Sequence, residues 1–195
     1  MNSLLKTFFS LLVLVLLATG AAAQKKYDVK SGIITFENSI RILAKPVPQR
    51  QILYFDEYGM KERKELYEGD VLMEAFLSDG RHLFNLVFEE STAYRSGRAV
   101  QGTETRFDGD SLSAVWKKKG TVKKLAAMKI AGRLCDAYEL VDAGGTTILA
   151  GWNHITLFTD NAAVGIHSVS KAVTIEENAK VPAEMFRVPP GFVIK

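Results

Sequence analysis

The sequence predicts a mainly β, antiparallel domain that extends over residues 24–195, and three features support this prediction. Runs of branched and aromatic residues, in which apolar and polar side chains often alternate, follow one another as they do in strands. Glycine and aspartate residues typical of tight turns separate these runs. No long linker, repeat or low-complexity tract divides residues 24–195. One antiparallel domain is therefore the simplest interpretation.

Residues 1–23 have the pattern of a secretory signal peptide. Lys6 is their one charged residue, an apolar run from Phe8 to Ala18 follows, and small residues end the segment at Ala23. The apolar run is shorter than the ~20 residues needed to span a bilayer. We therefore expect cleavage after about Ala23. The mature chain, residues 24–195, should be periplasmic or secreted, with no transmembrane segment.

Cysteine content and charge exclude several classes of protein. Cys135 is the only cysteine, so an internal disulfide is impossible, and no cysteine lies at the expected cleavage site to carry a lipid anchor. The formal net charge is +3 and loses one unit with Lys6, which gives no sign of nucleic-acid binding. The chain is long enough to bury a core without disulfides.

The first half of the mature chain contains the clearest hairpin signal. In YDVKSGIITFE, residues 27–37, apolar and polar residues alternate, except that Ile33 and Ile34 together suggest a strand covered on both faces. QILYFDEY, residues 51–58, predicts a strand that ends at Gly59. DVLMEAFL and RHLFNLVFEE are joined by Ser78, Asp79 and Gly80, which predicts a hairpin with a glycine turn.

The second half predicts one helix and a further series of strands. Residues 110–119 favour a helix with Asp110 as its cap, three lysines at its C-terminal end, and Gly120 after it. Residues 122–132 are ambiguous, but their length and flanking glycines favour a strand. Strands are then expected at 134–141, 146–152, 155–159 and 164–177.

The C-terminal segment is expected to cover the sheet. Pro182 suits the first turn of a short helix, and Pro189 and Pro190 exclude a central strand. Phe186 and Phe192 should pack on the core or across the mouth of the sheet, more as an apolar plug than as a moving lid.

Four segments resemble a family of uncharacterised exported bacterial domains: SGIITFE, LYFDEYGMKERKE, AGRLCDAYEL and ENAKVPAEMFRVPPGF. These domains are similar in fold to the LolA and LolB lipoprotein carriers. The resemblance implies a strongly curved antiparallel sheet of the mainly β (α+β) class, an incomplete barrel with one or two short helices in its mouth. In the carriers the concavity holds acyl chains.

No residue pattern predicts a catalytic or metal centre. Cys135 lies at the start of a predicted strand, where a small buried residue is favoured over a nucleophile or redox thiol. His82, His154 and His167 are placed on separate predicted strands without a second ligand at i+2 or i+4. Asp108 and Asp110 fit a helix cap better than a calcium loop, because the other loop ligands are missing. We predict no enzyme activity and no cofactor.

The basic segment KKKGTVKK, residues 117–124, follows Trp116. A solvated helix end and turn is the favoured interpretation, and contact with anionic lipid headgroups is the alternative.

Two binding functions remain open. The first is binding of an apolar ligand, a lipid or a lipoprotein acyl chain, in the hollow of the sheet. The residues predicted to line that hollow are Phe36, Phe55, Phe76, Phe84, Leu86, Trp116, Phe158 and Phe192. The alternative is a protein-interaction or structural module of the cell envelope whose hollow is filled by its own side chains. No oligomeric state is predicted.

Overall fold

The computed structural model describes residues 25–42, 45–98 and 107–195, so the predicted signal peptide lies outside the described residues. Within them the chain forms one sheet, one α-helix and two short 3-10 helices. The strands are β1 (Gly32–Ile42), β2 (Lys45–Asp56), β3 (Lys61–Glu68), β4 (Val71–Ser78), β5 (His82–Val87), β6 (Thr92–Arg98), β7 (Gly120–Lys124), β8 (Met128–Ile130), β9 (Arg133–Asp142), β10 (Gly145–Trp152), β11 (Ile155–Ala163), β12 (Ile166–Glu177) and β13 (Val193–Ile194). The helices are η1 (Glu57–Gly59), α2 (Gly109–Trp116) and η3 (Ala183–Phe186). None of the described helices is long and apolar enough to cross a membrane.

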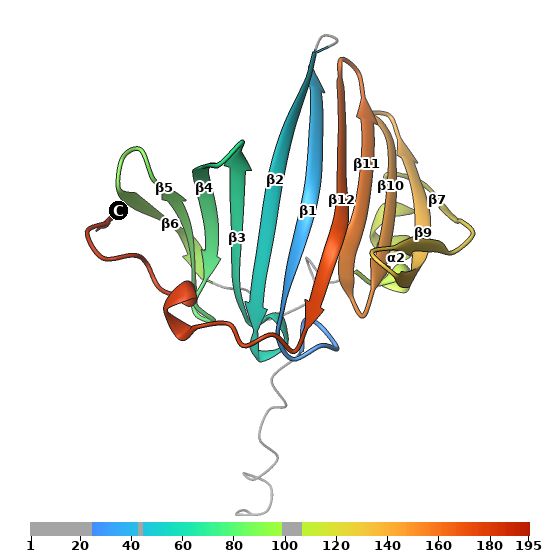
Figure 1. Ribbon diagram of the computed structural model, residues 1–195. Coiled ribbons are helices and arrows are strands. Elements are labelled where there is room, and N and C mark those ends of the chain that lie inside the picture. The colour runs from blue at the N-terminus through green and yellow to red at the C-terminus, as the bar shows by residue number, and fades with distance from the viewer. Residues whose placement is uncertain (1–24, 43–44, 99–106) are drawn as a thin grey trace, which may run out of the picture.

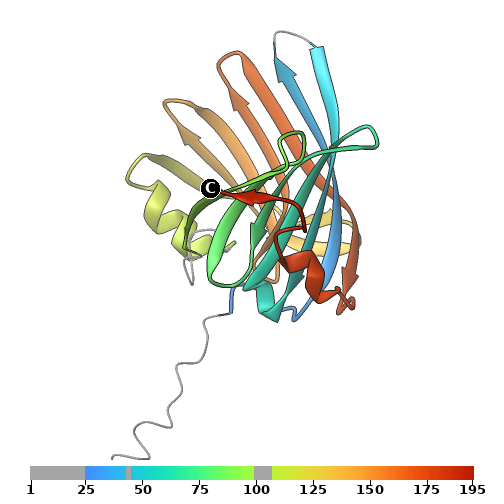
Figure 2. The same ribbon diagram turned by 90° about the vertical axis from the view of Figure 1, so that its left-hand side faces the viewer.

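The strands form a single curved sheet that does not close. Their order is β13-β6-β5-β4-β3-β2-β1-β12-β11-β10-β9-β7, and β8 pairs with β9 outside this path. Every pairing is antiparallel except that of β13 with β6. The edges of the sheet are β13 and β7. Figures 1 and 2 show the strong curvature, and Figure 1 shows β6, the neighbour of β13, far from β7. The predicted fold class, a curved antiparallel sheet forming an incomplete barrel with short helices, is confirmed.

Apolar side chains form two clusters on opposite faces of this sheet. Leu53 and Phe55 on β2 belong to the first cluster, whereas Tyr54 between them packs against the second. Because successive residues of a strand point to opposite faces, the two clusters lie on different faces, named here the first face and the second face. The first cluster comprises Tyr27, Val29, Ile34, Phe36, Leu53, Phe55, Ile130, Cys135, Ala137, Ala150, Ile155, Leu157 and Ala172. The second comprises Ala75, Leu77, Phe84, Leu86, Ala93 and Phe186.

The C-terminal segment covers the second cluster. After β12 the chain crosses to the other wing of the sheet, forms η3 and pairs β13 with β6 (Figure 1). Phe186 is buried, and Phe192 packs edge-on against Phe88 with ring centroids 5.3 Å apart. The prediction that Phe186 and Phe192 pack on the core is confirmed.

Two element boundaries differ from the sequence prediction. The helix begins at Gly109, and its cap is Asp108 rather than Asp110, because the Asp108 carboxylate accepts the Asp110 N–H at 3.1 Å. The helix ends at Trp116, so the lysines follow it. The first strand begins at Gly32. The preceding residues are held instead by the η1 turn, where Tyr27 donates its N–H to the Tyr58 carbonyl at 2.9 Å.

The hairpin prediction and the strand assignment of residues 122–132 are both confirmed. β4 and β5 are joined through Gly80, which has a φ of +91°. The ambiguous segment forms two strands, β7 and β8, on either side of a short break. Ala131 and Gly132 both take positive φ values and form the expected turn into β9.

Candidate functional site

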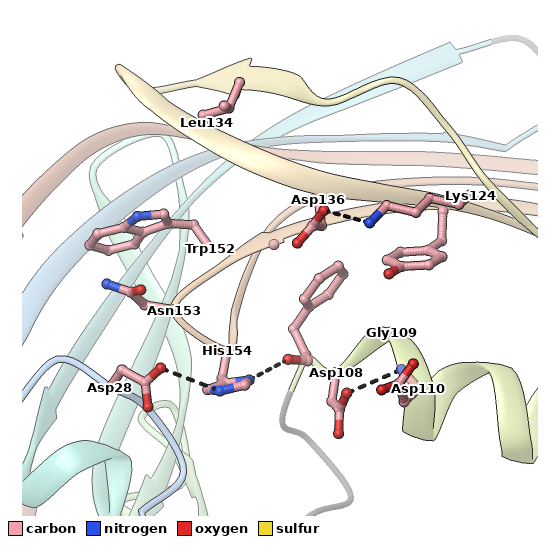
Figure 3. Close-up of a pocket in the computed structure, with 13 residues that line it drawn as sticks. Asp28, Asp108, Gly109, Asp110, Lys124, Leu134, Asp136, Trp152, Asn153 and His154 are labelled. Atoms are coloured by element: carbon pink, nitrogen blue, oxygen red, sulfur yellow. Dashed lines mark hydrogen bonds and ion pairs between the residues drawn. The ribbon is translucent and has the colours of Figure 1, made fainter.

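A polar pocket of about 510 Å³ lies where α2 meets the β9–β10 part of the sheet (Figure 3). Its carboxylates, cations and aromatic rings come from the N-terminal segment, α2, β7, β9 and the β10–β11 turn. The lining residues are Asp28, Phe107, Asp108, Gly109, Asp110, Lys124, Leu134, Asp136, Tyr138, Gly151, Trp152, Asn153 and His154.

Two glycines allow α2 to lie against the sheet. The Phe107 ring occupies the place of a side chain on Gly151, where a Cβ would come within 2.2 Å of the ring. A Cβ on Gly109 would lie 1.9 Å from the Tyr138 hydroxyl. Cys135 and Ala137 belong to the first cluster, so Asp136 between them lies on the second face. Gly151 pairs with Asp136, and the two contacts therefore place the start of α2 on the second face. The pocket therefore depends on close backbone approach at these two positions.

His154 joins three segments at the floor of the pocket. Its Nδ1 lies 2.8 Å from the Phe107 carbonyl oxygen, and its own carbonyl accepts the Phe107 N–H at 2.9 Å. A carbonyl oxygen only accepts, so Nδ1 carries a hydrogen. Nε2 faces the Asp28 carboxylate at 3.3 Å, as Figure 3 shows. His154 thus connects the N-terminal segment to the start of α2.

The upper wall of the pocket carries an exposed ion pair. Lys124 Nζ lies 3.0 Å from Asp136 Oδ1, and both side chains are 63% exposed. The hydrogen bond and charge of Asp136 raise the pKa of Lys124. In water such a pair contributes little to stability. Its charges therefore remain available to polar groups of a ligand.

The described residues of the pocket form no metal-binding cluster. Asp108 is engaged as the helix cap and also accepts the Ser111 hydroxyl at 2.8 Å, which supports the cap over a calcium loop. Among the described residues, no group of three or more His, Cys, Asp or Glu side chains is arranged to hold a metal ion. The arrangement can bind polar and charged groups, with Trp152 as an aromatic wall.

The three histidines do not converge. His82 lies 3.3 Å from Asp79, His167 2.8 Å from Asp160, and His154 contacts Asp28 as described above. His154 sits in the β10–β11 turn with a φ of +65°, so its predicted strand position is wrong.

A wider groove of about 720 Å³ crosses β12, β1 and β2 on the second face. Glu37 on β1 stands opposite Arg50 on β2 and Lys171 on β12, so a carboxylate lies in register with a cation on each side. Arg50 also stacks 4.5 Å above the Tyr67 ring. The groove residues are Thr35, Glu37, Asn38, Ser39, Pro48, Gln49, Arg50, Gly69, Asp70, Val169, Lys171 and Val173. Sequence reasoning missed both hollows, because only strand register brings these residues together.

The eight residues predicted to line an apolar hollow are divided between the two faces. Phe36 and Phe55 belong to the first cluster and Phe158 packs against it, whereas Phe84 and Leu86 belong to the second, where Phe192 also packs. Phe76 is 48% exposed, and Trp116 ends α2. None of the eight lines the polar pocket or the groove.

Cys135 lies inside the first cluster, with 1% of its surface exposed and no disulfide partner. Burial raises the pKa of its thiol. A raised pKa disfavours the thiolate that nucleophilic or redox chemistry requires. The expected burial of Cys135 is confirmed.

No protein-family model and no curated protein sequence matches this chain. Among solved structures, an uncharacterized conserved protein from Thermus thermophilus matches 89% of this chain and 94% of its own, with a TM-score of 0.58 and 9% identity. MucB in the Pseudomonas aeruginosa MucA/MucB complex matches 85% of this chain and 57% of its own, with a TM-score of 0.50 and 10% identity. The present chain thus spans little more than half the length of MucB.

A LolA superfamily protein from Nitrosomonas europaea, NE2245, also matches. It covers 85% of this chain and 94% of its own, with a TM-score of 0.40 and 13% identity. At these identities a likeness defines the fold alone. The unclosed sheet itself makes the protein a curved-sheet domain of the kind that the sequence resemblance implied.

Proposed function

We propose that this protein is an exported, non-catalytic interaction module of the cell envelope, and that its partner binds on the second face of the sheet. The observation that carries the proposal is the packing of its aromatic side chains. Most of them fill two separate clusters, whereas the polar pocket and the groove both carry charged side chains on their walls. The solved structure of MucB, which shares the fold, is a complex with a second protein, MucA.

The groove across β12, β1 and β2 is the proposed contact surface. It spans β12, β1, β2 and the β3–β4 turn, so it has room for a polypeptide segment that crosses several strands. Glu37 on β1 lies in register with Arg50 on β2 and with Lys171 on β12, so the groove presents one negative and two positive charges in a row. Such a pattern favours a partner of matching charge order and supports specificity more than affinity.

Binding of an apolar ligand, a lipid or a lipoprotein acyl chain, is the second candidate. Phe76 favours it, because this large side chain is 48% exposed on the first face, opposite Asn85 and Lys64. The apolar side chains Val169 and Val173 in the groove also favour it. Such binding would be mostly hydrophobic and would depend weakly on salt.

Native mass spectrometry of protein purified from its own cells separates the two candidates. A stoichiometric lipid adduct, displaced by a lipid-tail probe, supports the apolar ligand. Protein free of lipid agrees with the interaction module.

Site-specific photo-cross-linking in the cell then tests the groove. A cross-linker that replaces Lys171 should give one discrete protein adduct, which the additional Arg50→Glu substitution should reduce. The matched control is a cross-linker that replaces Lys180, a lysine outside the groove. Equal adducts from both positions would contradict the proposed contact surface.

A further inference from the structure

The two central hairpins carry an apolar apex that stands away from the rest of the sheet. β1, β2 and β12 contain 11, 12 and 12 residues, whereas β3 to β6 contain between 6 and 8. Ile42 at the end of β1 pairs with Ile166 at the start of β12, so the ends of both hairpins lie side by side. Figure 1 shows these ends as the highest points of the molecule.

Apolar side chains at this apex lie in solvent. Val164, in the β11–β12 turn, is 96% exposed, and Ile166 is 49% exposed. Ala162 and Ala163 beside them are also exposed, as is Val47 on β2 at 37%. Gly165, with a φ of +78°, makes the tight turn that holds Val164 outward. A valine so fully exposed contributes nothing to the fold, so the folded chain does not require it.

The charged residues closest in sequence to the end of the β1–β2 hairpin are basic. Residues 38–50 contain Arg41, Lys45 and Arg50 and no Asp or Glu. On the β11–β12 hairpin, the Asp160 carboxylate lies 2.8 Å from His167 Nε2. Arg41, which is exposed, pairs across β1 and β12 with His167.

We propose that this apex, Val164 and Ile166 with Arg41 below them, docks on the surface of an anionic phospholipid bilayer. Exposed apolar side chains next to Lys or Arg residues can insert shallowly between lipid headgroups while the cations contact the phosphates. The apex residues Arg41, Val164 and Ile166 are few, whereas a stable protein interface needs ~800 Å² from each partner. The apex therefore suits a bilayer better than a protein. This inference is independent of the proposed function, because it uses the hairpin ends and not the groove.

Vesicle co-sedimentation tests the proposal with residues 24–195, the chain expected after cleavage. We expect binding to vesicles of phosphatidylglycerol and phosphatidylcholine and much weaker binding to phosphatidylcholine alone. Each Lys or Arg near an anionic surface contributes ~1 kcal/mol, which corresponds to about fivefold in partitioning. Arg41→Glu should therefore reduce binding by about fivefold or more, and added salt should weaken binding by the wild type.

Val164→Asp should also weaken vesicle binding by about fivefold or more without changing the melting temperature, because the side chain is 96% exposed. The matched control is Val193→Asp, since Val193 is 59% exposed at the far edge of the sheet. Absence of binding to anionic vesicles, or an equal loss in Val164→Asp and Val193→Asp, would overturn the proposal. The proposal would also be overturned if a protein partner required Val164 for binding and the protein did not bind to the vesicles.

A fluorescent label provides a measurement that does not depend on lost binding. The variant Val164→Cys, labelled with an environment-sensitive dye, should shift its emission to the blue on anionic vesicles. Cys135 is 1% exposed and should not take the label. The same dye on Val193→Cys should show no shift. A label at position 164 that stays in water while the protein sediments with vesicles would contradict docking through the apex.

Discussion

Arg63 and Glu65 form an ion pair inside an apolar cluster. Arg63 Nε lies 2.7 Å from Glu65 Oε1, and the two side chains are only 8% and 6% exposed. The Tyr67 hydroxyl donates to the other Glu65 oxygen at 2.7 Å, and the Arg63 guanidinium lies 5.9 Å from the Phe88 ring centre. Both carboxylate oxygens therefore have a donor, which a buried charge requires.

Removing one member of this pair should be far more costly than removing both. Glu65→Ala leaves the Arg63 charge buried and uncompensated, so we expect a loss of about 3–5 kcal/mol in the free energy of unfolding. The double variant Arg63→Met, Glu65→Leu should lose much less. Denaturant unfolding measures both values. A double variant as unstable as Glu65→Ala would mean that shape, not charge, determines the cost.

Tyr67 should make stability depend on pH in the alkaline range. Burial, together with the hydrogen bond and charge of Glu65, raises the pKa of Tyr67 to about 12. A raised pKa in the folded state contributes stability that is complete below the unfolded value of ~10 and is lost as pH rises through the folded value. Tyr67→Phe should cost about 1.5 kcal/mol or more at neutral pH.

The advantage of Tyr67 over phenylalanine should decrease between about pH 10 and pH 12. A titration of phenolate absorbance, compared between the wild type and Tyr67→Phe, isolates this group from the other tyrosines. A difference spectrum that titrates near 10 would show that the hydrogen bond to Glu65 is absent in solution.

The buried thiol of Cys135 should be unreactive in the native protein. We expect a soluble thiol reagent to label it far more slowly than in the unfolded chain, because burial excludes the reagent and raises the thiol pKa. Cys135→Ala should cost about 1 kcal/mol or more through lost packing. Labelling at equal rates in both states is the outcome that this prediction does not permit.

Among the elements, the β4–β5 hairpin gives the sharpest test of turn chemistry. Gly80 has a φ of +91°, a conformation that a branched side chain strongly disfavours. Gly80→Val should lower the free energy of unfolding by about 1 kcal/mol or more. Gly144→Val in the β9–β10 turn is the control, because Gly144 is not among the glycines with positive φ. Equal effects on the melting temperature would place the strain elsewhere.

Alternation and turn residues were sufficient to predict the β4–β5 hairpin and the strands from β9 to β12. They did not predict β3, whose sequence KERKELYE has charged residues on the face that packs inward. Arg63 and Glu65 are buried there only because each neutralises the other. No rule of apolar periodicity identifies a strand whose buried positions hold an ion pair.

The expected hollow shows a different limit of sequence reasoning. Alternation within one strand places Phe84 and Leu86 on one face, but it does not relate that face to those of other strands. Register makes this connection: Phe76 stands opposite Asn85, so it points away from Phe84. Likewise Leu53 pairs with Lys64, while Tyr54 faces Arg63. The aromatic residues could be predicted as core residues, but not as the lining of one cavity.

At the scale of the whole molecule, the C-terminal segment replaces the second layer that an open sheet needs. Among the described strands, the edge strands β13 and β7 do not pair with each other, so the sheet does not close into a barrel. The segment that follows β12 supplies Phe186 to the second cluster and ends in β13, which pairs with β6. A connection from the middle of the sheet to its edge thereby covers Ala75, Leu77 and Leu86.

Phe186→Ala should consequently destabilise the entire domain. Phe186 is 4% exposed and is the one member of the second cluster that comes from outside the sheet. Truncating a buried phenylalanine costs about 3–5 kcal/mol, through lost burial and the cavity left behind. The control is Val193→Ala, which should change the free energy of unfolding by less than about 0.5 kcal/mol, because Val193 is 59% exposed.

The manner of unfolding shows whether the C-terminal segment belongs to the same cooperative unit. If it does, Phe186→Ala should lower the midpoint of one denaturant transition and leave its slope unchanged. A segment that detached by itself would instead free β13 from β6 and expose the second cluster while β1 and β12 stayed folded. Amide exchange would then become fast at Arg95 in β6, whose N–H donates to the Lys195 carbonyl at 2.9 Å, and stay slow in β1. Because the segment supplies an aromatic side chain that no strand replaces, we expect a single transition.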